Sequence, residues 1–325
     1  MIPGYREYDI SFWFLLFLSL FFAMIIGDAG YGLLFLGLTV FARIKLKKAP
    51  AEPFFLLSVF SACTMIWGAM TGTWFGARAL VSESSFLSVF VIESIASFPK
   101  SGIDSAEVVK YLCFVIGAIH LSIAHIRNIV RYLPHIRAFA EVGWLSVVWG
   151  MFFGIQIIVL NRDGTGPVFN WLANISLMDA AFFPVVGGLA LVALFAEQRN
   201  NFFKGVGRGL AWLPLKLLDS IGAFSDVVSY VRLFAVGLAT VKVAESFNQM
   251  AAGVGFGFPA GIAAALILFL GHALNIVMGC LSIIVHGVRL NMLEFSGHLG
   301  MEWTGIPYRP FRNRTESVPE KSAAG

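Results

Sequence analysis

Long apolar segments separated by short polar stretches dominate this chain. A helix needs about 20 apolar residues to cross the hydrocarbon core of a bilayer, and several of the segments reach that length. The pattern predicts eight membrane-spanning helices, at residues 10–27, 29–43, 54–76, 108–126, 142–160, 180–196, 213–250 and 259–298. We therefore expect an all-α integral membrane protein, with a polytopic membrane domain over residues 1–311 and a polar, disordered cytoplasmic tail over 312–325.

The first apolar run extends from residue 10 to residue 41, which is too long for one helix. The glycine-rich segment 27–32 (GDAGYG) interrupts it, so we expect two short spans joined by a tight break. The run is also too long for the apolar part of a cleavable signal peptide, and no small-residue cleavage site ends it.

The last two predicted spans, 213–250 and 259–298, are much longer than the others. At about 1.5 Å per residue, each is nearly twice as long as a perpendicular crossing. We therefore expect both helices to tilt strongly or to project from the membrane.

Lysine and arginine in the short loops predict the orientation, because cytoplasmic loops of membrane proteins are rich in these residues. With eight spans, one side collects Arg6, Arg43, Lys45, Lys47, Lys48, Arg127, Arg131, Arg137, Arg199, Lys204, Arg208, Arg309, Arg312, Arg314 and Lys321. The other side holds Arg78, Lys100, Lys110 and Arg162. This distribution predicts that both termini are cytoplasmic. The outer segment 82–106 contains a short apolar stretch, 86–95, which we expect at the membrane interface.

Composition agrees with a membrane protein. Hydrophobic residues are 58% of the 325-residue chain and charged residues 13%, and the mean hydropathy is +0.80, whereas a soluble protein carries about a quarter charged residues. The net charge of +4 is modest and scattered, so it predicts no nucleic-acid partner. Cys63, Cys113 and Cys280 lie in apolar runs without metal-ligand spacing, so we expect buried, inert thiols and no metal site.

Glycines form three clusters. Those at 68, 72 and 76 repeat every four residues, which predicts a close-packing face on the third span. Those at 205, 207 and 209, and those at 253, 255 and 257, are expected in flexible loops. Neither loop has the pattern of a phosphate-binding loop, so we expect no nucleotide or other cofactor on this chain.

Polar and ionisable groups inside membrane helices are costly, and they therefore mark functional sites. In the seventh predicted span, spacings of 4, 3, 4 and 4 place a set of residues on one helical face. This set is Ser225, Ser229, Arg232, Val236 and Thr240. In the eighth, spacings of 3, 4, 3, 4 and 3 give a polar stripe made of His272, Asn275, Gly279, Ser282, His286 and Arg289. The two longest helices thus each carry a polar face with an arginine.

These faces are typical of an ion pathway interrupted by a fixed charge. Arginine stays charged at physiological pH, so it attracts a carboxylate and repels a passing cation. The neighbouring hydroxyl, amide and imidazole groups can bond water or a transferred proton. The alternative is that Arg232 and Arg289 pair with acids such as Asp226 or Glu294 and only hold helices together.

The histidines also have a simpler interpretation. His272 and His286 fit either a proton path or a structural role, since polar groups of membrane helices often bond across helices. His120 and His125 are five residues apart and do not share a helical face, so we do not expect them to form a metal-binding pair.

Four motifs have a recognisable order. Residues 22–34 contain the GDAGYG segment, 229–239 read SYVRLFAVGLA, 286–295 read HGVRLNMLEF, and 308–311 read YRPF. In this order they resemble the opening membrane signature, the essential-arginine helix, the second-arginine helix and the ending of the a-type stator (subunit I) of V/A-type rotary ATPases. The resemblance covers nearly the whole chain.

The resemblance implies a stator that is no enzyme on its own but couples ion flow to rotation of a proteolipid ring in an ATP-driven pump or ATP synthase. Two offset half-channels would connect the ring carboxylates to opposite sides of the bilayer. Arg232 and Arg289 would attract these carboxylates and block a direct leak. From the polar faces of the two long helices, rather than from the family motifs, we assign these residues to the half-channels: Ser225, Ser229, Thr240, His272, Asn275, Ser282, His286 and Glu294. The implied location is the cell membrane of a prokaryote.

The chain departs from the family pattern in two respects. The sequence starts just before the first predicted span, so we expect the family's large cytoplasmic N-terminal domain to be a separate polypeptide, through which the chain contacts central-stalk and peripheral-stalk subunits, or the stator to be a shortened one. Some members have histidine eight residues after the first arginine and glutamate ten residues before the second, where this chain has Thr240 and Gly279. The expected ion is a proton, with sodium left open.

The alternative function is a self-contained secondary ion transporter or channel. Such proteins usually contain an internal repeat and paired broken helices, whereas the two halves of this chain show no repeat. A helical scaffold would not explain an arginine on both long helices. Copurification with a proteolipid ring would separate the stator from both alternatives.

Overall fold

The computed structural model describes residues 4, 7, 9–78, 80, 85–99, 104–160, 176–198, 202–255 and 257–304. These residues form helices and no strands, as predicted. The longer helices are α1 (Ser11–Ile26), α2 (Ala29–Lys45), α3 (Ala51–Thr71), α6 (Ser105–Tyr132), α7 (Ala138–Ile158), α8 (Leu177–Phe195), α10 (Leu213–Ser229), α11 (Val231–Val254) and α12 (Ala260–Ser282). The shorter elements are α5 (Ser85–Ser88), η1 (Glu93–Ile95), α9 (Phe202–Ala211), η3 (Ile283–Gly287), η4 (Leu290–Phe295) and α13 (Ser296–Leu299).

Six helical runs in the described residues are long and apolar enough to cross a membrane. The last two, Leu213–Val254 and Ala260–Leu299, have 42 and 40 residues, so the prediction of two unusually long C-terminal helices is confirmed. Helices α1 and α2 are shorter, with 16 and 17 residues. The chain is a multi-pass membrane protein; eight crossings and the strong tilt stay predictions, and the 308–311 motif and the tail 312–325 lie outside the described residues.

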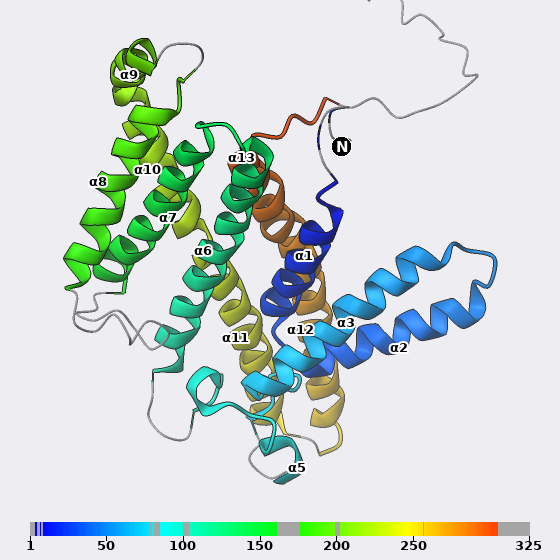
Figure 1. Ribbon diagram of the computed structural model, residues 1–325. Coiled ribbons are helices and arrows are strands. Elements are labelled where there is room, and N and C mark those ends of the chain that lie inside the picture. Colours follow the sequence, from blue (N-terminus) through cyan, green and yellow to red (C-terminus); the bar gives the residue numbers. More distant parts are fainter. Residues whose placement is uncertain are drawn as a thin grey trace, which may run out of the picture.

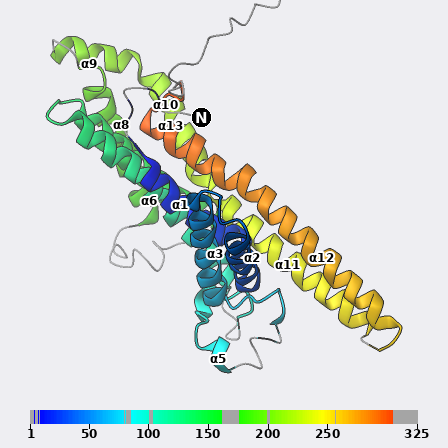
Figure 2. The ribbon, with the colours of Figure 1, turned by 90° about the vertical axis from the view of Figure 1, so that its right-hand side faces the viewer.

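Helices α11 and α12 lie side by side along much of the length of the molecule, as both views show (Figures 1 and 2). Helices α6, α7 and α8 form a group on one side of this pair, and the α2–α3 hairpin extends away on the other (Figure 1). The start of α1 and the end of α13 lie at the same end of the molecule (Figure 1). An even number of crossings would produce this arrangement.

The GDAGYG segment forms the tight break that the sequence predicts. Gly27 ends α1 with a φ of 65°, a conformation that favours glycine. Asp28 begins α2 as its N-cap, accepting hydrogen bonds from the backbone N–H groups of Gly30 and Tyr31 at 2.8 and 3.2 Å. The same carboxylate accepts two further backbone N–H bonds of 2.9 Å, from residues 75 and 76 after α3. With its charge solvated by four amides, Asp28 is a structural centre for the α1–α2 break.

The predicted glycine face on the third span is wrong. Gly72 has a φ of 70° and ends α3, so residues 72 and 76 lie beyond the helix rather than along it. Gly68 packs as expected, since a Cβ at this position would lie 2.6 Å from the carbonyl carbon of Asp28. Gly76 packs closely too, but from the segment after α3, where a Cβ would lie 2.6 Å from the Cβ of Ala244.

The predicted flexible loop at glycines 205, 207 and 209 is also wrong, because these residues belong to helix α9. Gly209 lies directly against the carbonyl oxygen of Ala193 in α8, and Gly205 lies against Gln198. Close packing on α8 therefore stabilises a helix that glycine's low propensity argues against.

The core lies where α1, α6, α7 and α11 meet. Its large side chains are fully buried, and they include Phe21, Phe114, Phe152, Tyr230 and Leu233. Seven residues of α1 are buried, mostly in its second half. Helix α1 is thus an internal support for the two long helical runs that carry the arginines, Leu213–Val254 with Arg232 and Ala260–Leu299 with Arg289.

Candidate ion-translocation site

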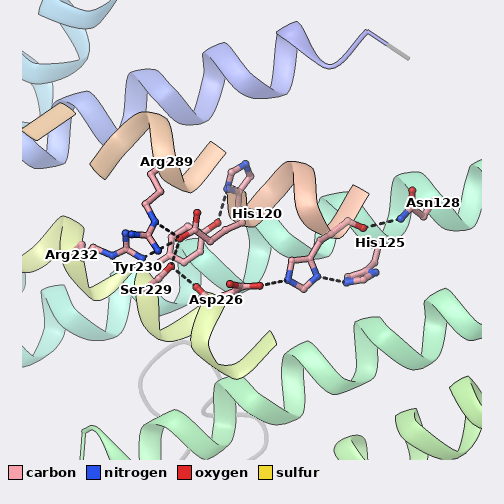
Figure 3. Close-up of polar contacts among 10 residues, drawn as sticks. His120, His125, Asn128, Asp226, Ser229, Tyr230, Arg232 and Arg289 are labelled. Carbon is pink, nitrogen blue, oxygen red and sulfur yellow. Dashed lines mark hydrogen bonds and ion pairs between the residues drawn. The ribbon is translucent and has the colours of Figure 1, made fainter. Parts of the chain in front are cut away.

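Two arginines from different long helices meet at one carboxylate (Figure 3). Arg232 lies in the first turn of α11, and its Nη2 donates a hydrogen bond to Glu294 Oε1 at 3.1 Å. The Nε of Arg289 lies 3.6 Å from the same oxygen. Ser229 Oγ donates to it as well, at 3.1 Å. The structure therefore joins Arg232, Arg289, Ser229 and Glu294 in one cluster, which we call the arginine site.

The arginine site carries an excess positive charge. The Glu294 side chain is 3% exposed, whereas the side chains of Arg232 and Arg289 are 24% and 54% exposed. One carboxylate cannot neutralise two guanidinium groups, so about one positive charge remains. Arg232 Nη1 and Glu294 Oε2 are also buried without a hydrogen-bond partner among the described residues. The site can therefore accept another polar or anionic group.

Two irregularities in the long helices build this geometry. Helix α10 ends at Ser229 and α11 begins at Val231, so the first long helix is interrupted two residues before Arg232. The second contains the π-helical turns η3 and η4. In a regular α-helix, Arg289 and Glu294 would be about 140° apart around the axis, because they are five residues apart. A π turn, which bonds residues five apart, allows both to reach one point.

A second polar cluster lies further along α11 and α12. The hydroxyl of Tyr31 is 2.7 Å from His272 Nδ1 and accepts a hydrogen bond from Asn275 Nδ2 at 3.1 Å. Asn275 Nδ2 also donates to the carbonyl oxygen of Thr240 at 2.9 Å, and His272 Nε2 lies 3.2 Å from Asn248 Oδ1. We call these five residues the Tyr31 cluster. The sequence predicted three of them and missed Tyr31 and Asn248.

A third group of hydrogen-bonded side chains, which we call the histidine chain, was not predicted. It links Asp226, His298, His125 and Glu141, and Figure 3 labels Asp226 and His125. Asp226 Oδ2 lies 3.1 Å from His298 Nε2, His298 Nδ1 lies 3.0 Å from His125 Nε2, and His125 Nδ1 lies 3.0 Å from Glu141 Oε2. Both ring nitrogens of each histidine are therefore engaged. A proton that arrives at one nitrogen can leave from the other, as in other histidine proton shuttles.

The histidine chain also decides between the two acids considered for the arginines. Asp226 pairs with His298, while Glu294 pairs with both arginines. The sequence did hold one indication of the histidine chain, because ionisable groups in or beside apolar segments are unusual. These groups are Asp226, Glu141 and His125. Sequence spacing could not reveal their contact, since they come from helices α10, α7 and α6.

His120 is a buried structural histidine beside the arginine site (Figure 3). Its ring is stacked between Phe17 and Phe295, with centroid distances of 3.9 and 4.2 Å. Its Nδ1 lies 2.8 Å from the hydroxyl of Tyr230, the residue between α10 and α11. This contact holds the interruption that precedes Arg232.

Three predicted half-channel residues belong to none of these clusters. Ser225 is exposed, and Ser282 and His286 are half-buried. Hydrogen bonds between the described residues join none of the three to the arginine site or to the Tyr31 cluster. The described part of the chain also contains no group of three His, Cys, Asp or Glu residues that could hold a metal ion.

Comparison with known proteins gives a consistent set of relatives, although no known family profile matches the chain. It is 38% identical to V-type ATP synthase subunit I of Borreliella burgdorferi over 320 residues, which are 96% of this chain and 50% of that protein. It is 36% identical to V-type ATP synthase subunit I 1 of Treponema pallidum, covering 96% of this chain and 49% of that protein. It is 27% identical to A-type ATP synthase subunit I of Methanocaldococcus jannaschii, covering 97% and 46%. The chain spans about half the length of these relatives.

Proposed function

Since this chain is homologous over 96% of its length to subunit I of V-type ATP synthases, we propose that it is the ion-translocating stator of the membrane sector of a rotary ATPase or ATP synthase. In this role the chain catalyses no reaction by itself. It provides the fixed membrane surface past which the carboxylates of a proteolipid ring move, and it couples their protonation to rotation.

The observation that carries this proposal is the convergence of two guanidinium groups on one buried carboxylate. Arg289 Nε and Arg232 Nη2 lie 3.6 and 3.1 Å from Glu294 Oε1, and Arg289 is 54% exposed. The excess charge attracts a deprotonated ring carboxylate as it arrives. In the low dielectric of the bilayer, the same charge repels a hydrated cation, which blocks a direct leak.

The other two polar groups supply the two half-channels in this proposal. The histidine chain includes residues of α10 and α13, which lie toward the end of the molecule that holds the start of α1 (Figure 1). The Tyr31 cluster uses later residues of α11 and earlier residues of α12, so it lies on the other side of the arginine site. A proton can therefore enter from one side of the membrane and protonate a ring carboxylate. The neutral carboxyl group then rotates with the ring and releases the proton to the other side. Both termini are cytoplasmic in this scheme.

The wider assembly follows from the same proposal. Central-stalk and peripheral-stalk subunits would contact this stator through cytoplasmic domains, and the complex would lie in the cell membrane of a prokaryote. A proton is the expected ion, because both paths contain imidazole groups, with carboxyl groups in the histidine chain and a phenol in the Tyr31 cluster.

The test is ATP-driven ion uptake in sealed vesicles that carry the assembled complex. We expect Arg232→Ala to abolish coupled uptake while the ring still copurifies. The control is Arg78→Ala, because the Arg78 side chain is 67% exposed and lies 3.8 Å from Glu245; it should keep near wild-type uptake. Full uptake by an assembled Arg232→Ala complex would reject the stator mechanism. Ion transport by the chain reconstituted without a ring would favour a self-contained transporter instead.

A further inference from the structure

A wide apolar groove separates α1 from the first part of α3. It has a volume of about 1430 Å³ and extends along α3 from Ala51 to Met70. Figure 1 shows the cause, since the α2–α3 hairpin diverges from α1 toward the loop that joins α2 to α3. A volume of this size exceeds the range of about 300–1,000 Å³ that small-molecule pockets occupy.

The walls of the groove are apolar and suit the acyl chains of a lipid. They carry large aliphatic and aromatic side chains, among them Phe12, Leu16, Leu20, Phe55, Ile66 and Trp67. Phe12 and Phe55 are 70% and 73% exposed, so no part of the described chain covers them. The hydroxyl of Ser19, a polar group in the wall, donates to the carbonyl oxygen of Leu15 in its own helix.

The opposite face of α3 shows what a helix-binding surface looks like in this protein. There the α2–α3 contact is made through Gly32 and Gly68, where a Cβ would lie 2.7 Å from Met65 N and 2.6 Å from the carbonyl carbon of Asp28, respectively. Close helix packing in membranes uses such small residues. The groove face has large residues instead, which favours acyl chains over another transmembrane helix.

A basic loop lies at the open end of the groove. Residues 43–48 contain the exposed side chains of Arg43, Lys45, Lys47 and Lys48, and Ala51 follows directly as the first residue of α3. Glu52 is the one acidic residue in the sequence 41–60, so this segment carries four positive charges and one negative charge, a net +3. Basic clusters beside membrane helices attract anionic lipid headgroups.

Helix α3 is long enough to line the hydrocarbon core. It has 21 residues, or about 30 Å at 1.5 Å per residue, which is about the thickness of the core of the whole bilayer. A lipid with its headgroup at the basic loop would therefore place its acyl chains along the part of α3 that lies in the same leaflet. We propose that this groove is a binding site for an anionic phospholipid, with its phosphate at residues 43–48 and its acyl chains between α1 and α3. This site is independent of the proposed stator function.

The test is native mass spectrometry of the purified protein, with all copurifying subunits, after exchange into phosphatidylglycerol or phosphatidylcholine. We expect phosphatidylglycerol to be retained and phosphatidylcholine to be lost. The variant K45A/K47A/K48A should weaken phosphatidylglycerol retention by about tenfold or more, because each juxtamembrane basic residue contributes about fivefold in affinity. The control K204A/R208A removes basic residues of α9 and should leave retention unchanged.

A second pair of variants tests the groove itself. Cys63→Trp adds bulk to the groove wall and should displace the lipid, whereas Ile158→Trp, at a 71% exposed position on α7, should not. Equal retention of both lipids, or retention that survives both the lysine and the Cys63 variants, would overturn the proposal. Loss of a bound polypeptide from Cys63→Trp, with lipid retention unchanged, would also overturn it and identify a protein occupant.

Discussion

Glu294 determines the charge balance of the arginine site. Its carboxylate is 3% exposed and is the shared partner of Arg232 and Arg289. A buried charge without a partner is strongly unfavourable, and removal of one member of a buried pair costs about 3–5 kcal/mol. Ser229 contributes a further hydrogen bond to the same oxygen. Glu294 therefore holds two long helices together as well as setting the excess charge.

We predict that Glu294→Ala lowers the free energy of unfolding by about 3 kcal/mol, because it leaves the largely buried Arg232 without its partner. Glu245→Ala is the matched control. Glu245 also lies near two basic residues, Arg78 and Lys242, but their side chains are 67% and 55% exposed. Exposed ion pairs contribute about 0–1 kcal/mol. Chemical denaturation in detergent measures both variants, and equal losses would contradict the assigned role of Glu294.

At the scale of elements, short interruptions position the functional groups. Gly27 and Asp28 separate α1 from α2, Tyr230 separates α10 from α11, and π turns alter the end of the second long helix. Each interruption is held by specific contacts, such as the four backbone amides on Asp28. The elements are thus shaped by tertiary contacts at their ends.

The close approach of α2 and α3 gives a prediction at this scale. Gly68→Leu should destabilise the hairpin by about 3 kcal/mol or more, because the new side chain would meet the backbone of Asp28 and Ala29, which cannot move aside. Gly37→Leu on α2 is the control, since nothing lies within 4 Å of a Cβ at that position. Thermal unfolding of the two purified variants measures the difference. If Gly68→Leu unfolds at the same temperature as Gly37→Leu, the described packing is wrong.

At the scale of the whole molecule, three polar groups follow one another along the long helices. The histidine chain, the arginine site and the Tyr31 cluster combine residues from α2, α6, α7, α10, α11, α12, η4 and α13. The proposed proton path needs hydrogen-bonding groups on each side of the fixed charge, and the histidine chain and the Tyr31 cluster lie on the two sides of the arginine site.

We predict that Asp226→Asn slows ATP-driven ion uptake by about tenfold, which corresponds to a barrier increase of about 1.4 kcal/mol. The amide cannot accept and release a proton beside His298, whose Nε2 lies 3.1 Å away. Asp219→Asn on the same helix is the control, because Asp219 is 54% exposed and pairs with Lys216. Uptake in sealed vesicles measures both, and unchanged uptake by Asp226→Asn would remove the histidine chain from the proton path.

The apolar runs were enough to predict the fold class and the unusual length of the last two helices. Helices in a bilayer must satisfy their own backbone hydrogen bonds, so long apolar segments have few alternatives to a helix. Helical periodicity also identified Arg232 and Arg289, because ionisable groups inside apolar helices are conspicuous. Glycine was less informative: the four-residue repeat did not give a helical face on the third span, and the glycine cluster at 205–209 forms a helix rather than a flexible loop.

Contacts between distant segments were decided only by the tertiary structure. His125 and His298 are 173 positions apart, and Tyr31 and His272 are 241 apart, so no local pattern could pair them. The π turns that bring Arg289 and Glu294 to one point likewise depart from the regular helix on which spacing arguments rest. The sequence by itself determined that the long apolar segments form helices and which of them carry the two arginines, because a segment in the bilayer must satisfy its own backbone hydrogen bonds. The contacts between polar groups of different helices were decided by the tertiary structure, because they depend on how all the helices pack together.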